Sequence, residues 1–253
     1  MNPAATRALA LFGVLGLWAA LSWGNALAQY MNPVLLPTPA DVAQVAIDTV
    51  RSGELLRHVA LSLLRVGQGF GVAAALAVAL GILAALCMPL RLLAEPVVEF
   101  IRPIPPLAFL PIFLAWFGLG ETSKVVFIGY ATFFPMFVAI SASVLRIDPM
   151  LLRAAASLGA SRTDLVWRVI LPAAMPGIVV ALRLGFGLAL FVIVAAEFIG
   201  ADAGLGHFIM EGRTFFDPAQ IVLGAVLLGA LGSLINALLL AVERRFLRGR
   251  VAS

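Results

Sequence analysis

Arg183 is the residue whose type and surroundings most clearly suggest chemistry, because it interrupts the apolar run from Ala173 to Ala196. If that run crosses a bilayer, Arg183 lies about ten residues, or about 15 Å, from the start of the helix. Ionisable side chains at such depth are costly and usually functional. An arginine facing a central cavity could attract an anion. The alternative is a structural pair with a carboxylate such as Glu99 or with carbonyls at a helix end.

A second group of candidates surrounds a run of prolines. Glu99 and Arg102 are three residues apart, so they could pair on one helix face, and four prolines follow them: Pro103, Pro105, Pro106 and Pro111. Each proline removes a backbone donor and favours a break. Broken helices in membranes line cavities or are buried in protein. We therefore expect residues 99–111 to line a pathway or to lie at a subunit interface, with a kinked packing helix as the alternative.

Arg65 and Glu197 also interrupt apolar runs. We expect them to form a structural pair, with a part in an outer gate as the alternative. The complete set of pathway candidates is Glu99, Arg102, Pro103, Pro105, Pro106, Arg183 and Glu197.

The elements that must position these residues are transmembrane helices. The chain is 62% hydrophobic and only 12% charged, whereas a soluble domain carries roughly 25% charge. A membrane-spanning helix needs about 20 apolar residues. The charge-free runs predict an all-α polytopic membrane protein with six spans, at about 8–28, 59–87, 97–118, 124–145, 174–199 and 219–242.

Several function classes are not supported. The single cysteine, Cys87, excludes an internal disulfide, and the two histidines, His58 and His207, lie far apart in the sequence, so we expect neither a metal site nor an enzyme. The chain has no G-x-x-x-x-G-K-[ST] phosphate loop, so it cannot hydrolyse ATP itself. The pI near 10.2 does not indicate nucleic-acid binding, because many of the arginines lie where membrane proteins place the charges that set their orientation.

The charge distribution predicts the orientation. With both termini in the cytoplasm, the inner segments carry ten Lys and Arg residues and the outer segments four, as the positive-inside rule requires. Ala26-Leu27-Ala28 resembles a signal-peptidase site, but the apolar stretch before it is longer than a signal peptide needs, which favours a retained helix.

A polar segment stands out between the fourth and fifth predicted spans. Asp148-Pro149 is a good helix start, Gly159 can supply a left-handed C-cap, and Ser161 with Asp164 resembles a capping box. We expect two short helices with one apolar side at Leu151, Leu152, Ala155 and Leu158, the second ending at Pro172. The resulting elbow, residues 149–172, could dock on another protein or lie on anionic lipid.

The elbow resembles the cytoplasmic signature of ABC importer permeases, E-A-A-x-x-x-G followed by I-x-L-P. Here the matching residues are Arg153-Ala154-Ala155, Gly159 and Val169-Ile170-Leu171-Pro172, with Arg153 in place of the signature Glu and Val169 in place of Ile. The resemblance implies docking on an ATPase. The residues it assigns to coupling are Leu151, Leu152, Arg153, Ala154, Ala155, Ser157, Leu158, Gly159, Ala160, Ser161, Arg162, Leu171 and Pro172.

Further stretches resemble the taurine, alkanesulfonate and nitrate branch of these permeases. They are Leu36-Pro37-Thr38-Pro39, Arg102-Pro103-Ile104-Pro105-Pro106, the residues 116–124, Ala196-Glu197 and Gly204-Leu205-Gly206. This resemblance implies a bacterial inner-membrane importer of a small anion. It also implies two ATP-binding subunits that hold ATP and Mg²⁺, a periplasmic binding protein facing residues 200–217, and a second, usually identical, permease chain.

The alternatives are import of a neutral heteroaromatic such as a pyrimidine vitamin precursor, or, in another class, an ion-driven secondary transporter. We expect residues 1–58 to form the first helix and an amphipathic periplasmic segment, with Val42, Val45, Ala46 and Val50 on one face. Residues 59–253 then form a five-helix core. The glycines at 67, 69, 71, 224 and 232 suggest close helix packing.

Overall fold

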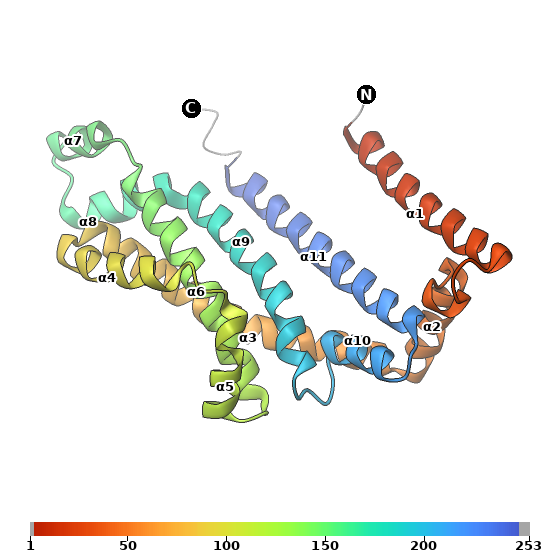
Figure 1. The fold of residues 1–253 in the computed structure, drawn as a ribbon. Helices are drawn as coiled ribbons and strands as arrows, with labels where there is room; N and C mark the ends of the chain where they lie inside the picture. The colour runs from red at the N-terminus through yellow and green to blue at the C-terminus, as the bar shows by residue number, and fades with distance from the viewer. Residues whose placement is uncertain (1–2, 248–253) are drawn as a thin grey trace. The chain divides into compact units, whose positions relative to one another are not determined.

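A computed structural model describes residues 3–247, and the regular structure in that range is helical throughout (Figure 1). This confirms the all-α prediction. Among the described residues, four helices are long and apolar enough to cross a membrane, and a bent pair would be a fifth span. The first of the six predicted spans, 8–28, falls within α1, Pro3–Ala28, which has 26 residues.

Contacts divide the chain into two compact units. The first joins the described residues up to Ser62 with Asp202–Ala230, and the second joins Leu63–Ala201 with the described residues from Leu231 on. Two long helices, α3 (Glu54–Leu86) and α11 (Pro218–Leu247), contribute to both units. Arg248 and Arg250, which we counted for the orientation, lie outside the described residues.

The first unit is built around α2, Pro39–Ser52, the amphipathic helix that the sequence predicts. Thr38 and Asp41 form its capping box, and these hydrogen bonds from Thr38 hold the pKa of the Asp41 carboxyl below its usual value. Val42 is buried against Phe208 and Leu223, whereas Val50 is exposed. The predicted apolar face of α2 is therefore only partly buried within this unit.

Residues 200–217, which lie between the fifth and sixth predicted spans, contain the helix α10, Leu205–Thr214, that the sequence analysis did not predict. Its start is fixed by α3: the Gly204 amide lies 3.0 Å from Nδ1 of His58, and the Leu205 amide donates to Oγ of Ser62 at 2.8 Å. Both side chains are buried. The prediction missed this helix because its anchors lie far away in the sequence.

The second unit is centred on the packing of α6 (Glu121–Leu145) against α9 (Leu171–Phe198), the most extensive helix contact. Two glycines of α9 allow the close approach. A Cβ at Gly177 would meet Ser143, and one at Gly185 would meet Met136. The buried core on either side of this contact is apolar, with Ile140, Ile178 and Ile193 among its members.

The third predicted span, 97–118, is wrong as a single helix. The chain forms α4 (Met88–Ile101), a short 3₁₀ turn η2 (Pro106–Phe109) and α5 (Leu110–Phe117), and the two parts are bent by 86°. Pro103, Pro105 and Pro106 cannot donate backbone hydrogen bonds, and a proline also disfavours helix at the residue before it. Residues 88–96, which lie between the second and third predicted spans, are helical as part of α4.

Other boundaries also shift. α3 begins at Glu54 rather than at 59, and Pro172 does not end a helix. Instead, α8 (Arg162–Asp164), a π-helical turn η3 (Leu165–Ile170) and α9 form one continuous run from Arg162 to Phe198. Because Pro172 lies in the first turn of α9 and follows the wider π turn, its ring is accommodated without a break.

Candidate functional site

The elbow has the local structure that the sequence predicts. Its first helix is α7, Pro149–Ser157, and Oδ1 of Asp148 accepts a hydrogen bond from the Met150 amide at 2.8 Å. Gly159 has φ of 85°, and the amide of Ala160 donates back to the Ala155 carbonyl at 3.2 Å. The chain is thus reversed by a glycine-dependent C-cap.

The second part of the elbow starts with the predicted capping box. Oγ of Ser161 accepts from the Asp164 amide at 3.1 Å, and the Asp164 carboxylate accepts from the Ser161 amide at 3.3 Å. Leu152 and Leu171 are half-buried and pack against the core of the second unit. The elbow is therefore attached to the helix bundle through its apolar residues rather than held away from it.

The remaining surface of the elbow is exposed. Leu158 is 89% exposed, and Leu151 is 47% exposed. Ala154, Ser157, Gly159 and Arg162 are also exposed, whereas Ala155 and Ala160 are half-buried. The four residues predicted to share one apolar side therefore divide into an exposed pair, Leu151 and Leu158, and a half-buried pair, Leu152 and Ala155.

Arg153, at the signature Glu position, is exposed, and its Nε donates to the Pro149 carbonyl at 3.4 Å. The sequence analysis missed Met150 and Trp167, which are exposed apolar side chains in the same segment. Trp167 could have been selected from the sequence, because it is an aromatic residue in a polar stretch.

Two of the pathway candidates, Glu99 and Arg102, lie around one groove beside the proline break. Glu99 and Arg102 line a groove of about 230 Å³ in the second unit, together with Val98, Phe137 and Ser141. Glu99 and Arg102 are exposed and do not form an ion pair with each other within the described residues. Pro103 and Pro105 are exposed, and Pro106 is half-buried. The groove thus presents both charge signs.

The broken span is held against α6 by aromatic side chains. Phe109 and Phe113 each lie with their ring centroids 5.2 Å from that of Tyr130. Phe113 also packs against Phe127, with ring centroids 5.8 Å apart. These contacts fix α5 and the turn before it in place beside α6.

Arg183 lies on α9 and is half-buried. It is not brought into the groove of Glu99 and Arg102, whose lining comes from α4 and α6 with Arg102 just beyond α4. Its place in the pathway stays a prediction.

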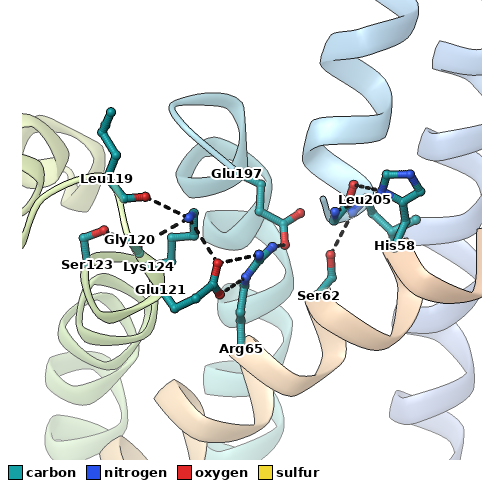
Figure 2. A network of polar contacts seen from close by, with 11 residues as sticks. His58, Ser62, Arg65, Leu119, Gly120, Glu121, Ser123, Lys124, Glu197 and Leu205 are labelled. Carbon is teal, nitrogen blue, oxygen red and sulfur yellow. Dashed lines mark hydrogen bonds and ion pairs between the residues drawn. The ribbon is translucent and has the colours of Figure 1, made fainter. Parts of the chain in front are cut away.

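Arg65 and Glu197 form the expected ion pair, with Nη1 of Arg65 2.7 Å from Oε1 of Glu197. Two residues that the sequence analysis did not assign to a site complete the group (Figure 2). Glu121 accepts from Nε and Nη2 of Arg65 at 2.5 and 2.7 Å, and Lys124 lies 3.4 Å from Glu121. We call these four residues the Arg65 cluster.

The cluster joins α3, α6 and α9. The side chains of Arg65, Lys124 and Glu197 are only 4%, 2% and 0% exposed, whereas that of Glu121 is 61% exposed. Nζ of Lys124 also donates to the Leu119 and Gly120 carbonyls at 3.0 and 3.3 Å. Lys124 is the only lysine in the sequence, and this was the feature from which the sequence analysis could have selected it as a candidate.

Comparisons with known proteins identify the family of this chain. The family described as "Binding-protein-dependent transport system inner membrane component" matches residues 77–250. The taurine transport system permease protein TauC of Escherichia coli K12 is 34% identical over 248 residues, covering 96% of this chain and 90% of TauC. The putative aliphatic sulfonates transport permease protein SsuC of Bacillus subtilis 168 is 32% identical over 220 residues, 87% of this chain and 80% of SsuC.

The fold is similar to that of a solved transporter. An inward-facing structure of the MetNI methionine ABC transporter superposes with a TM-score of 0.68 at 21% identity, over 76% of this chain and 95% of that chain. The chain therefore belongs to the family of binding-protein-dependent transport system inner membrane components, the permeases of ABC importers.

Proposed function

We propose that this chain forms the membrane pathway for a small organic anion of the sulfonate class, and that separate ATPase subunits drive transport through the elbow. The observation that carries the proposal is the elbow itself. A capped helix at the signature position leaves Leu158 almost fully exposed, and the following segment runs without a break into α9. A displacement of the elbow would therefore act directly on a membrane helix.

Docking on a protein explains the elbow surface better than binding to lipid. Small side chains at Ala154, Ser157 and Gly159 let a partner approach the backbone, and Leu158 offers an apolar anchor. A helix that lies on lipid usually presents a continuous apolar face, whereas Leu152 and Ala155 are turned toward the bundle.

The proposed assembly follows from the family. This chain would pair with a second copy, with two ATPase subunits that bind ATP and Mg²⁺, and with a periplasmic binding protein. The orientation has both termini and the elbow in the cytoplasm, supported by the excess of arginine in those segments.

The substrate class is supported by the names of the relatives, which transport taurine and aliphatic sulfonates. A cation at Arg102 in the groove and a half-buried Arg183 on α9 suit an anionic group. Reconstitution into proteoliposomes with the cognate ATPase and binding protein, followed by ATP-driven uptake of radiolabelled taurine, methanesulfonate and nitrate, tests this assignment. Absence of ATP-dependent uptake of taurine and methanesulfonate would contradict it, whether or not nitrate is taken up.

The docking role is tested by removing the elbow helix. Deletion of residues 151–159 should abolish co-purification of the ATPase while the chain still inserts into the membrane. Leu158→Ser should weaken co-purification, whereas Leu35→Ser, the same change at another exposed leucine outside the elbow, should not. Full retention of the ATPase by the deletion variant would refute docking.

A further inference from the structure

The two carboxylates of the Arg65 cluster differ in their exposure to solvent. Glu197 is fully buried on α9, while Glu121 is the first residue of α6 and its side chain is 61% exposed. α6 has 25 residues, or about 37 Å of helix, which exceeds the hydrocarbon thickness of about 30 Å. Glu121 therefore stands where water and solutes can reach it.

Glu121 also occupies the edge of Arg65 best suited to an oxyanion. Its two oxygens accept from Nε and Nη2 at 2.5 and 2.7 Å, the two-point arrangement by which a guanidinium binds carboxylates and phosphates. A sulfonate presents the same kind of oxygen pair. The opposite side of the guanidinium is held by Glu197 at 2.7 Å, so Arg65 keeps its position if Glu121 turns away.

The second cation of the cluster is equally fixed. Lys124 is held by the Leu119 and Gly120 carbonyls, and its side chain is 2% exposed. If the Glu121 carboxylate leaves, the two cations Arg65 and Lys124 outnumber the one remaining carboxylate of the cluster, Glu197, and the cluster carries a net positive charge. The amides of the first turn of α6 add to the attraction for an anion.

We propose that the edge of Arg65 covered by Glu121 is an anion-binding site, and that the Glu121 carboxylate stands in for the anionic group of the solute. The solute's sulfonate or carboxylate displaces Glu121, which turns into solvent, and Glu121 returns when the solute leaves. This inference rests on the proposed import of a small organic anion and gives that anion a contact on α3 and α6.

The test measures binding rather than uptake, so its result is independent of the transport assay. The permease complex is purified in detergent, and the midpoint of thermal unfolding is followed with increasing sodium methanesulfonate, with sodium chloride at equal concentration and with uncharged dimethyl sulfone. Because a ligand that binds only the folded state raises the midpoint, we expect methanesulfonate alone to raise it.

Glu121→Gln removes the competing charge and keeps the side-chain shape. We expect its midpoint to be lower without ligand and to recover with methanesulfonate at a concentration at least tenfold below that needed for the wild type. Asp48→Asn, which removes one exposed negative charge outside the cluster, should respond like the wild type.

Two further variants keep the test decisive. Glu121→Asp retains the charge with a shorter reach and should respond at an intermediate concentration, which serves if Glu121→Gln does not fold. The double variant Glu121→Gln with Arg65→Lys removes the two-point hydrogen bonding of the guanidinium, so methanesulfonate should no longer raise its unfolding midpoint.

The proposed site is refuted if Glu121→Gln and Asp48→Asn respond alike, or if chloride or dimethyl sulfone is as effective as methanesulfonate. If the binding test fails but the wild type still takes up taurine, the anion site at Arg65 is refuted and the proposed transport function is not.

Discussion

At the scale of single residues, the buried charges are the most informative feature. Arg65 and Glu197 could be paired from the sequence, because an ionisable side chain in an apolar run needs a partner. Glu121 and Lys124 could not be assigned to this group from the sequence. Both lie at the predicted start of a span, where an exposed charge is the ordinary expectation. The structure shows that Lys124 instead folds back onto the carbonyls of the turn before α6.

Glu197→Gln should destabilise the protein strongly. Removing one partner of a buried ion pair leaves the other charge uncompensated and costs about 3–5 kcal/mol. Glu95→Gln is the control, because Glu95 pairs with Arg91 at 3.5 Å with its side chain 55% exposed, and such pairs are worth about 1 kcal/mol or less. Thermal unfolding in detergent compares the two variants, and equal losses would contradict the structural importance of Glu197.

Arg183→Ala should reduce anion uptake about tenfold or more, since losing a hydrogen bond to a charged group costs about 1.5–3 kcal/mol. Co-purification of the ATPase should be unchanged, and Arg183→Lys should retain part of the uptake. The measurement is ATP-driven taurine uptake in proteoliposomes. Normal uptake by Arg183→Ala would remove this residue from the pathway.

At the scale of elements, the sequence predicted the existence of most helices and several of their caps. The elbow was predictable because its capping signals are local: Asp148, Gly159 and Ser161 act on neighbouring backbone groups. The direction of the chain at the proline break, the helix α10 and the continuity through Pro172 depend on contacts between distant segments or on a π turn. Hydrophobic patterning carries no information on these.

Glycine spacing on α3 was also only partly informative. We predicted close packing at residues 67, 69 and 71, but a Cβ would meet neighbouring atoms only at Gly69, where the Val125 carbonyl lies at 2.6 Å and Cβ of Ile128 at 2.8 Å. Gly67 and Gly71 have nothing within 4 Å. The glycine spacing predicts close packing somewhere on the helix, and the structure shows that, of these three glycines, only Gly69 lies against α6.

Gly69→Ala should therefore destabilise the contact between α3 and α6, by about 1–3 kcal/mol, because the clash involves backbone that cannot move aside. Gly67→Ala, two residues away on the same helix, should be neutral or stabilising by up to about 1 kcal/mol. Thermal unfolding of the two variants side by side is the measurement, and an equal effect at both positions would contradict the predicted contact.

Gly159→Ala should weaken the elbow, since a left-handed conformation costs an L-residue with a side chain about 1–2 kcal/mol. Gly159→Asn should be milder because asparagine tolerates this conformation. ATPase co-purification and ATP-driven uptake should fall in the order wild type, Asn, Ala. The reverse order would show that the turn at residue 159 does not govern coupling.

At the scale of the whole molecule, the class of protein followed from composition, and the family from one short signature with a few matching stretches. The number of spans was less accessible. A bent pair of helices replaces the third of the six uniform spans that hydropathy predicts, because hydropathy registers apolar length but not the direction of a helix.

The orientation gives a direct test. A fluorescent reporter that folds only in the cytoplasm should be active when fused at Ser253, and alkaline phosphatase inserted at Gly118, in the turn between α5 and α6, should be active outside. The positive-inside count predicts both results. An inactive cytoplasmic reporter at Ser253 would overturn the proposed topology.

The π turn at Leu165–Ile170 has one more consequence. A π turn holds an extra residue relative to an α-helix, and each residue of an α-helix advances the chain by about 100° around the axis. Deleting one residue here would remove the extra residue and restore regular helix, and the elbow would keep its direction relative to α9. Deleting one residue from the regular part of α9 would instead rotate the elbow by about 100°. A single deletion should therefore be tolerated at Leu165–Ile170 and should misalign the elbow with the membrane helix when it is made further along α9.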